Sequence, residues 1–349
     1  MMKALVYAGP GKKEVREVEK PRIINDGDAI IKLTKTTICG TDSHILGGDV
    51  AAVKEGTILG HEGVGIVEEV GSGVQHFKVG DKVIISCVTA CGVCDYCKIA
   101  LYAHCKDGGW ILGHLINGTQ AEYVHIPHAD NSLYHIPKGI SDDAAVMISD
   151  ILPTGFEIGV LNGQVSPGDT IVIVGAGPIG MSVLLTSQFY SPANIIMVDL
   201  DDNRLAESKR FGATHTINSK DADAAIKEIM EITDGRGVDV AIEAVGYPQT
   251  FDICQKILAP GGHLANVGVH GKPVDLQLQD LWIRNVTITT GLVSTNSTPM
   301  LIKTLASGKI KVEELITHYF TFDNILEAYE TFQNASKEKA LKVIIDFKE

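Results

Sequence analysis

Residues 170–180 read Thr-Ile-Val-Ile-Val-Gly-Ala-Gly-Pro-Ile-Gly and decide how the middle of the chain folds. A β-branched, apolar run leads directly into three glycines spaced G-x-G-x-x-G, and a helical stretch begins at the proline. The first glycine permits a tight turn, the second lets the backbone approach a pyrophosphate, and the third lets helix and strand pack closely. The stretch predicts a dinucleotide-binding turn made of Gly175, Gly177, Pro178, Ile179 and Gly180. The alternative is an α/β turn that needs glycine for packing alone.

An acidic residue at the end of the next predicted strand supports the dinucleotide interpretation. Asp199 follows the predicted strand at residues 194–198 and lies nineteen residues beyond Gly180. Its carboxylate can accept hydrogen bonds from the adenosine ribose hydroxyls, and it would repel a 2′-phosphate. Arg204 is near enough in sequence to accommodate such a phosphate, but Asp199 favours NAD over NADP.

Apolar and helical stretches alternate along the chain from about residue 167 onward. The predicted strands are residues 170–174, 194–198, 238–244, 263–267 and 286–289. Helical patterns such as residues 222–232 and 249–257 lie between several of them. This alternation predicts an α/β fold of βαβ units with a doubly wound parallel sheet.

The first part of the chain has a different pattern. Its short β-type runs, broken by many glycines, predict a mostly β domain; they include residues 29–32, 64–70 and 82–86. The last fifty or so residues have helical patterns at 299–307 and 324–333 and a β-type run at 340–347. These patterns alone do not assign the last segment to either domain.

Composition narrows the class of protein. The 349 residues carry a formal net charge of −13, with a pI near 5.4, so nothing favours binding to phosphate backbones or anionic membranes. The longest apolar stretch, residues 171–185, is interrupted by glycines and falls short of the roughly 20 residues that span a bilayer. The N-terminal residues lack a signal-peptide pattern. We therefore expect a cytoplasmic protein that binds neither nucleic acid nor membrane.

Four of the seven cysteines lie within fifteen residues and predict a metal site. The spacing C-x-x-C-x-x-C-x7-C can place four thiolates around one tetrahedral zinc ion, and the residues are Cys91, Cys94, Cys97 and Cys105. A closed all-thiolate shell has no open position for substrate, so its role is to hold a loop together. The alternative is four free buried cysteines. We interpret Cys87 and Cys254, which lack such neighbours, as small buried apolar residues.

A second, scattered set of metal-binding residue types lies earlier in the chain. Cys39, His61 and Asp150 together offer one sulfur, one imidazole and one carboxylate, which would make an open zinc site with room for a water or an alcohol oxygen. Taken singly, these residues prove little, because a lone histidine is often a surface or hydrogen-bonded residue and a single aspartate before an apolar turn is often a helix cap.

The order and spacing of these motifs resemble those of the medium-chain, zinc-dependent alcohol dehydrogenases over essentially the whole chain. The resemblance implies a GroES-like catalytic domain over residues 1–152, a Rossmann domain over residues 153–295, and a segment, residues 296–349, that returns to the catalytic domain. It implies two zinc ions per chain, a structural one on the four cysteines and a catalytic one on Cys39, His61 and Asp150. Glu62 would lie beside the catalytic ion or exchange in as a ligand.

The resemblance also assigns roles in catalysis and cofactor binding. Zinc would act as a Lewis acid on the alcohol oxygen, and Thr41 would take the proton and pass it through the cofactor ribose to His44 and solvent. Asp42 would accept a hydrogen bond from the far nitrogen of His61. The residues implied near the cofactor, besides the glycine turn, Asp199 and Arg204, are Thr154, Val245, Val267, Gly268, Val269 and Lys342, of which Lys342 would reach the pyrophosphate.

The substrate is expected to be a small alcohol or its ketone. Asp150, where many relatives have cysteine, resembles the branch that oxidises secondary alcohols, and Trp110 matches a pocket residue of that branch. The best-known members of the branch lack the four cysteines and use NADP, unlike this chain. A polyol or amino-alcohol dehydrogenase is the main alternative, and a non-catalytic dinucleotide-binding protein is a remote one. The resemblance suggests a homo-oligomer, a tetramer rather than a dimer.

Overall fold

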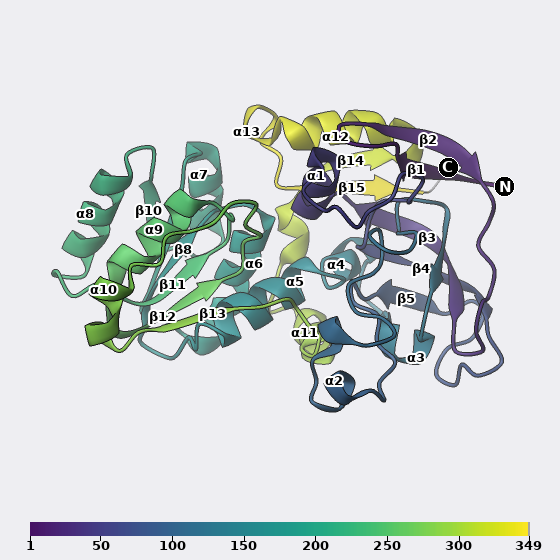
Figure 1. Cartoon of the computed structure of the whole chain (residues 1–349), viewed down its shortest axis with the longest axis horizontal. Coiled ribbons are helices and arrows are strands. Elements are labelled where there is room, and N and C mark those ends of the chain that lie inside the picture. Colours follow the sequence, from purple (N-terminus) through teal and green to yellow (C-terminus); the bar gives the residue numbers. More distant parts are fainter. Residues whose placement is uncertain (348–349) are drawn as a thin grey trace. The chain divides into compact units, whose positions relative to one another are not determined.

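The computed structural model describes residues 1–347, which form two compact units (Figure 1). The first unit contains residues 1–153 together with 294–347, and the second contains residues 154–293. The second unit is therefore inserted into the sequence of the first. Each unit is described separately.

The second unit is built on a six-stranded sheet in which every pairing is parallel. The strands, in spatial order, are β10 (His215–Asn218), β9 (Asn194–Asp199), β8 (Thr170–Val174), β11 (Val238–Glu243), β12 (Leu258–Asn266) and β13 (Thr287–Thr290). In chain order this is 3-2-1-4-5-6, the order of a Rossmann fold, which confirms the predicted doubly wound sheet.

Helices cover the sheet because its central strands are apolar on both faces. Ile171 to Val174 and Ile195 to Val198 are all buried. The helices of this unit are α6 (Pro178–Ser187), α7 (Asp202–Arg210), α8 (Ala222–Ile232), α9 (Pro248–Ile257) and α10 (Leu278–Leu281). One core cluster joins α8 and α9 to the strands through Ile229, Phe251 and Ile257.

The first unit contains a two-stranded antiparallel sheet and a seven-stranded mixed sheet. The small sheet pairs β1 (Met2–Tyr7) with β2 (Lys13–Val18). The large sheet runs in the order β14 (Ile316–Thr321), β15 (Lys342–Asp346), β3 (Ala29–Thr37), β4 (Gly63–Val70), β5 (Lys82–Ile85) and β7 (Leu133–His135), with β6 (Tyr123–Ile126) also paired to β3.

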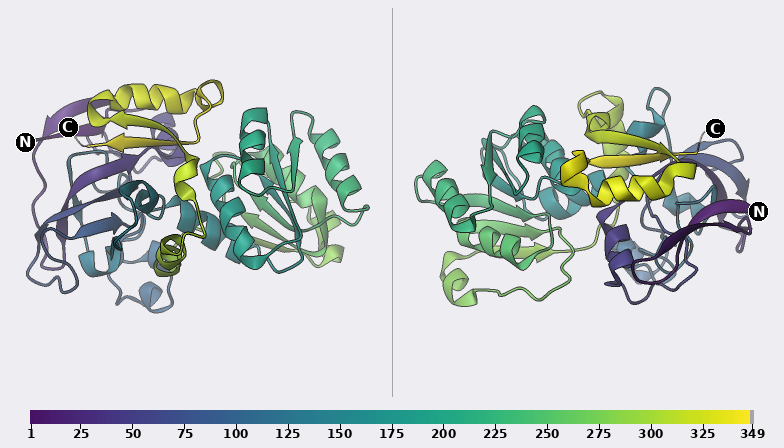
Figure 2. Two further views of the ribbon diagram at one scale, coloured as in Figure 1. Left: turned by 180° about the vertical axis from the view of Figure 1, so that it is seen from behind. Right: turned by 90° about the horizontal axis from the view of Figure 1, so that it is seen from above.

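The C-terminal strands are integral to this first unit. β15 pairs antiparallel to β3 and parallel to β14, and the helix α12 (Ile325–Gln333) packs on them (Figure 2). Tyr329 of α12 is fully buried in a core that also contains Leu5 and Ile345, so residues from both ends of the chain share one core.

The other helices of the first unit are short. They are α1 (Gly40–Gly47), α2 (Asp95–Lys98), α3 (Ala129–Ser132), α4 (Asp142–Val146), α11 (Thr298–Ala306) and α13 (Ala335–Glu338). At the boundary between the units, α5 (Ile151–Thr154) continues into a π-helical stretch, Gly155–Leu161. Within residues 1–347, no helix combines the length and apolar character needed to cross a membrane.

Candidate functional site

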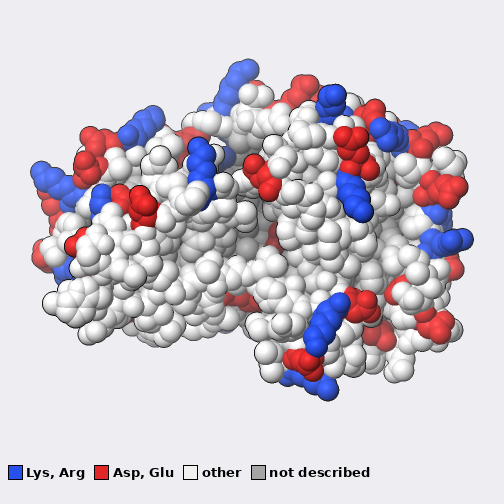
Figure 3. Space-filling model, viewed as in Figure 1, with Lys and Arg blue, Asp and Glu red and all other residues white. Residues whose placement is uncertain are grey.

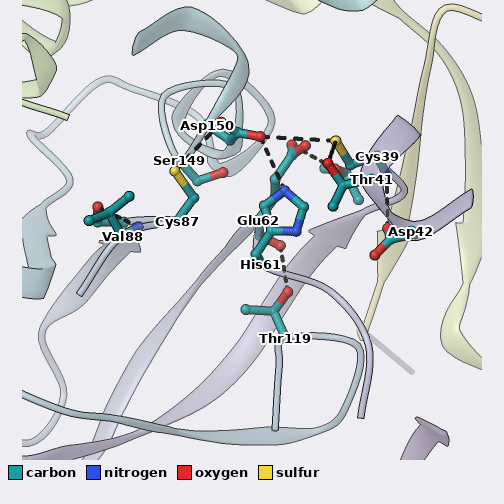
Figure 4. A network of polar contacts seen from close by, with 12 residues as sticks. Cys39, Thr41, Asp42, His61, Glu62, Cys87, Val88, Thr119, Ser149 and Asp150 are labelled. Atoms are coloured by element: carbon teal, nitrogen blue, oxygen red, sulfur yellow. Dashed lines mark hydrogen bonds and ion pairs between the residues drawn. The ribbon is translucent and has the colours of Figure 1, made fainter. Parts of the chain in front are cut away.

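Four potential metal ligands from three separate segments meet inside the first unit (Figure 4). Cys39 immediately precedes α1, His61 and Glu62 immediately precede β4, and Asp150 immediately precedes α5. Their ligand atoms all lie within 4.8 Å of one another, and all but Cys39 are buried. We call these four residues the mixed-ligand group. The structure thus brings together the residues that the sequence predicted for a catalytic metal.

Hydrogen bonds link the three residues expected to bind the metal. His61 Nε2 lies 3.2 Å from Asp150 Oδ2, and the Cys39 thiol donates to the same oxygen at 4.0 Å. Burial alone would lower the pKa of His61, but the contacts with Asp150 and Cys39 outweigh it and raise this pKa well above its ordinary value. One carboxylate oxygen, one sulfur and one imidazole nitrogen therefore converge on one point.

Glu62 is held in place by a buried cation. Lys342 Nζ lies 2.8 Å from Glu62 Oε1 and 2.6 Å from Oε2, and both side chains are 1% exposed. The Thr37 hydroxyl also donates to Oε2 at 2.7 Å. The expectation that Lys342 reaches a cofactor pyrophosphate is wrong for this structure, because its ammonium is engaged by the glutamate beside the metal group.

The charges of this group suit a divalent cation. Glu62 and Lys342 neutralise each other, so a bound cation would face two negative charges, that of the Asp150 carboxylate and that of Cys39 once the cation has displaced its thiol proton. Zn²⁺ would balance them, and sulfur, imidazole and carboxylate are ligands that zinc accepts. Three such ligands leave one tetrahedral position for a substrate oxygen.

Asp42 occupies a different position from the one expected. Its Oδ2 accepts from the Cys39 backbone N–H at 2.9 Å and from Gln120 Nε2 at 3.1 Å, and no hydrogen bond to His61 is formed. Oδ1 is buried without a hydrogen-bond partner among the described residues. Burial raises the pKa of Asp42, while the nearby His61 opposes the shift. Asp42 therefore fixes the backbone of the cysteine ligand, and Tyr329 in turn holds Gln120 through a 2.8 Å hydrogen bond.

The proposed proton-relay residues share α1. Thr41 and His44 are three positions apart and so lie on one side of the helix. The Cys39 thiol donates to Thr41 Oγ1 at 3.7 Å, which places this hydroxyl beside the metal group. His44 Nδ1 lies 3.0 Å from Asp49 Oδ2, and about a third of its side chain is exposed.

The sequence predicted no functional role for Cys87, which we interpreted as a small buried apolar residue. The Cys87 thiol is buried and donates to Asp150 Oδ1 at 3.5 Å, so it contacts the oxygen that does not face His61 (Figure 4). Its backbone N–H also donates to Ser149 O at 3.0 Å. The position of this cysteine in the sequence gives no signal for that role, because the contact joins residues 63 positions apart.

Trp110 lies beside the metal group. Its ring meets the His61 ring edge-on at 6.5 Å and stacks on His114 at 4.3 Å. His114 was not predicted; its Nδ1 is 3.1 Å from the Trp110 carbonyl oxygen. The Trp110 ring, with the His114 ring stacked on it, therefore lies next to one of the expected metal ligands.

The four clustered cysteines form a second group, which we call the thiol lobe. Their sulfur atoms lie within 4.8 Å of one another, and the residues are Cys91, Cys94, Cys97 and Cys105. Backbone N–H groups of Lys106 and Cys97 donate to Cys94 and lower its pKa to about 6. Burial instead raises the pKa of Cys97 to about 12. Four sulfurs at this separation, with N–H donors around them, fit one tetrahedral zinc ion.

In the second unit, the glycine turn has the geometry of a pyrophosphate site. Gly175 has φ +109°, and a Cβ on Gly180 would lie 1.7 Å from the Gly175 carbonyl oxygen. A Cβ on Gly177 would meet only Arg204, at 3.8 Å, so space is open above the turn. Gly177 is the N-cap of α6, and no side chain accepts a hydrogen bond from the first N–H groups of this helix. These N–H groups are therefore available to an anion.

The residues expected around the adenosine lie beside this turn. Asp199 ends β9, and its Oδ2 accepts from the Ala176 N–H at 2.6 Å while Oδ1 accepts from the Asp201 N–H at 2.9 Å. Arg204 lies in α7, and its Nε is buried without a hydrogen-bond partner among the described residues. The carboxylate is thus fixed by backbone groups and retains lone pairs for a ribose hydroxyl.

The residues expected near the nicotinamide follow the ends of strands β11 and β12. Val245 is 38% exposed, and its Cγ2 is 2.6 Å from where a Cβ on Gly175 would lie, so this loop adjoins the glycine turn. Val267, Gly268 and Val269 follow β12, and Val269 is 62% exposed. Thr154 ends α5. Ligands of doubly wound sheets bind at this carboxyl edge.

Comparison with known proteins agrees with this geometry. Residues 25–138 match the family model for the alcohol dehydrogenase GroES-like domain, and residues 178–307 match the model for zinc-binding dehydrogenase. An alcohol dehydrogenase of Cupriavidus necator is 35% identical over 99% of this chain and 98% of its own length. The chain belongs to the zinc-dependent alcohol dehydrogenases. The predicted family is thereby confirmed, and the protein is an oxidoreductase acting on CH–OH groups.

Solved structures of the family extend the comparison. The apo form of zinc-dependent alcohol dehydrogenase 2 from Streptococcus pneumoniae superposes with a TM-score of 0.96, at 59% identity and complete coverage of both chains. An Escherichia coli alcohol dehydrogenase solved with NADH has a TM-score of 0.89 at 29% identity, covering 99% of both chains. A Sinorhizobium meliloti zinc-binding dehydrogenase at 25% identity, 99% coverage of both chains and a TM-score of 0.87 is bound to NADP. The family therefore uses nicotinamide dinucleotides of both kinds.

Proposed function

We propose that this alcohol dehydrogenase uses NAD and interconverts a small secondary alcohol and its ketone, with one catalytic and one structural zinc ion per chain. The observation that carries the proposal is the convergence of Cys39, His61 and Asp150 on one buried point, with Trp110 beside it. The thiol lobe would hold the structural ion. Its all-sulfur set leaves no open position for a substrate.

In the proposed reaction, bound zinc supplies Lewis acidity that lowers the pKa of the alcohol hydroxyl, and the nicotinamide accepts the hydride. The protein's own part is to remove one proton. Thr41 Oγ1, next to the Cys39 sulfur, is placed to accept it. His44, on the same side of α1 and partly exposed, would receive the proton after Thr41 and release it to solvent, and Asp49 orients its ring.

The choice of NAD rests on Asp199. Backbone N–H groups hold its carboxylate at the end of β9, where it would accept from the ribose hydroxyls and repel a 2′-phosphate. Arg204 is the opposing feature, because its Nε lacks a hydrogen-bond partner in the described part of the chain. We propose that Arg204 contacts the ribose or pyrophosphate of NAD.

The choice of a secondary alcohol rests on Asp150 and the side chains around it. Trp110 and the buried Cys87 present ring and thiol surfaces near the open metal position, which suit short apolar substituents. A polyol would need several additional hydrogen-bond partners.

We further propose that the protein is a homo-oligomer, with a tetramer favoured over a dimer. Strand β13 is an edge strand, and exposed apolar side chains lie within it or in the segment that precedes it: Leu278, Trp282, Ile283 and Ile288. Trp282 is 72% exposed, which is unusual for tryptophan. Acidic and basic side chains are interspersed elsewhere on the face in Figure 3, while the surface over α10 is mostly uncharged.

The test is absorbance at 340 nm with 2-propanol, ethanol and sorbitol in parallel, each with NAD and NADP, before and after a strong chelator. The proposal expects chelator-sensitive reduction of NAD, fastest with 2-propanol. Activity with sorbitol alone would move the substrate class to polyols. Preference for NADP would overturn the role given to Asp199.

A pair of matched variants tests whether Asp199 determines the preference for NAD over NADP. Asp199→Asn keeps the size of the side chain and removes its charge, so the ratio of kcat/KM for NAD over NADP should fall by at least about tenfold. Asp202→Asn, three residues further on at the start of α7, is the control and should leave the ratio unchanged. An unchanged ratio in Asp199→Asn would contradict the assignment.

A further inference from the structure

A buried glutamate lies beneath the two loops that the proposed function assigns to the nicotinamide. Glu243 is the last residue of β11 and is 0% exposed. Its Oε1 accepts from the backbone N–H groups of Val245 at 3.0 Å and Gly246 at 2.8 Å, and from the Thr250 hydroxyl at 2.6 Å. One carboxylate oxygen therefore fixes the whole loop between β11 and α9.

The same residue also fixes the loop after β12. The Glu243 backbone carbonyl accepts from the N–H groups of Val267 at 2.8 Å and Gly268 at 3.1 Å. The second carboxylate oxygen, Oε2, accepts no hydrogen bond from any residue in the described part of the chain, but His270 Nε2 lies 3.4 Å from it. Glu243 thus holds both loops, the first through its side chain and the second through its backbone carbonyl.

His270 completes the arrangement from the second loop. Its Nε2 is 2.8 Å from Asn266 Oδ1, and Asn266 Nδ2 donates to the Gly268 carbonyl at 3.0 Å. The imidazole packs edge-on against Phe251 of α9 at 6.1 Å and is largely buried. The ring therefore joins the end of β12, the loop that follows it and the helix that follows the first loop.

The two loops interlock so closely that only glycine fits where they meet. A Cβ on Gly268 would lie 2.3 Å from Glu243 Oε2 and 2.3 Å from the Gly246 nitrogen. Gly246 has φ +92°, and its Cβ would lie 2.2 Å from the Val269 carbonyl oxygen. With this packing, a shift of one loop must move the other.

From these contacts we infer that Glu243 and His270 are positioning residues for cofactor binding, which lock the loops at residues 244–250 and 266–270 in the conformation that receives the nicotinamide half of the dinucleotide. The inference rests on the proposed function for the identity of the ligand. Neither side chain needs to touch the cofactor, since both act through the backbone of Val245, Gly246, Val267 and Gly268. The buried carboxylate is tolerated because three N–H and O–H donors bond to Oε1 and His270 Nε2 lies 3.4 Å from Oε2.

The experiment compares wild-type holoenzyme with Glu243→Gln and His270→Phe. Glutamine keeps the size of the side chain but turns an N–H donor toward His270 Nε2, and phenylalanine keeps the packing on Phe251 without a polar atom. The Kd for NADH, measured by protein fluorescence, should rise about tenfold in Glu243→Gln and less in His270→Phe. In each variant the KM for NAD should rise together with the Kd for NADH, whereas kcat at saturating NAD and the zinc content should stay close to wild type.

The control is Asp239→Asn, which changes a carboxylate at the opposite end of the same strand, where it accepts from the Thr170 N–H and pairs with Arg236. It should leave the Kd for NADH unchanged. If Asp239→Asn and Glu243→Gln weaken NADH binding equally, loss of general stability explains the effect and the inference fails.

Hydrogen exchange separates this inference from the proposed function. In Glu243→Gln without any cofactor, amides in residues 244–250 and 266–270 should exchange faster than in wild type, while those of β8 and β9 should not. If wild-type protein binds neither NADH nor NADPH, the proposed function fails, and the exchange result still decides whether Glu243 locks the loops. Unchanged exchange in those loops, or an unchanged Kd in a folded Glu243→Gln protein, overturns the inference.

Discussion

The two metal-ligand groups of the first unit differ in how their charges are compensated. The mixed-ligand group combines sulfur, imidazole and carboxylates, and it is supported by side chains far apart in the sequence: Thr37, Gln120 and Lys342. The thiol lobe has four sulfurs within fifteen residues and is supported by backbone N–H groups of its own loop. One group depends on the whole fold, and the other is local.

This difference suits two different tasks. A local all-thiolate group can close around an ion and stiffen a loop, whatever the rest of the protein does. A group assembled from distant segments can keep an open position, because the fold, and not the metal alone, sets where each ligand lies. The comparison predicts that the two groups fail in different ways.

The largest expected effect is on activity. His61→Ala should reduce kcat/KM for the preferred alcohol by about 1,000-fold, or about 4 kcal/mol of barrier, because the substrate oxygen loses its Lewis acid. Cys97→Ser should instead lower Tm, by about 2–4 °C for each kcal/mol of stability lost, with a smaller loss of activity. Enzyme assays, calorimetry and zinc analysis on both variants test the contrast. If the two variants lose the same activity and have the same Tm, the mixed-ligand group and the thiol lobe do not have separate catalytic and structural roles.

A second prediction concerns the distant support of the mixed-ligand group. Lys342→Met leaves the Glu62 carboxylate buried without its cation and should destabilise the protein by about 3 kcal/mol. The double variant Glu62→Gln/Lys342→Met removes both charges and should recover most of that loss. Although burial lowers the pKa of Lys342, the charges of Glu62 and Cys39 raise it above its ordinary value of 10.5.

The sign of the pH dependence follows from that shift. A raised pKa in the folded state means that the contribution of the pair is fully present at neutral pH and is lost only as pH rises beyond 10.5. The destabilisation in Lys342→Met, measured by urea unfolding, should therefore be constant between about pH 7 and 9. A double variant no more stable than the single one would contradict the pairing.

The smallest effect concerns reactivity within the thiol lobe. A pKa of about 6 makes Cys94 a thiolate at neutral pH in metal-free protein, whereas the pKa of Cys97 is raised to about 12. Alkylation of Cys94 by iodoacetamide should be nearly constant from about pH 7 to 8.5 and fall as the pH drops below about 6. Peptide mapping by mass spectrometry measures the rate, and zinc should protect Cys94. A tenfold rise in rate between about pH 7 and 8 would show an ordinary thiol.

Much of the second unit could be predicted from sequence, because its strands and helices have strong local patterns. Predicted residues 170–174 and 222–232 coincide with β8 and α8. The short β10 was not predicted, since only one of its four residues is buried. Strand β12 begins at Leu258, five residues before the predicted start, because Pro260, Gly261 and Gly262 obscured its pattern.

In the candidate site, the residues that could bind a metal were predictable from sequence, but the side chains that contact them were not. Cysteine spacing and the types of Cys39, His61 and Asp150 indicated metal chemistry because few other functions use those residues together. The contact between Glu62 and Lys342 joins residues 280 positions apart and depends on β15 docking beside β3. For the same reason Lys342 was assigned to the pyrophosphate, Asp42 to His61, and Cys87 to no role.

Because the second unit is inserted within the first, the two units become complete at different times during synthesis. Residues 154–293 leave the ribosome complete, and this unit can fold while the first unit still lacks β14 and β15. Until Lys342 emerges, Glu62 has no buried cation beside it, and the mixed-ligand group carries one negative charge too many for a neutral site with Zn²⁺. The thiol lobe is complete nearly 240 residues earlier. If the thiol lobe binds the structural ion and the mixed-ligand group the catalytic one, as proposed, we expect a nascent chain to bind the structural ion first and to become active only when β15 docks.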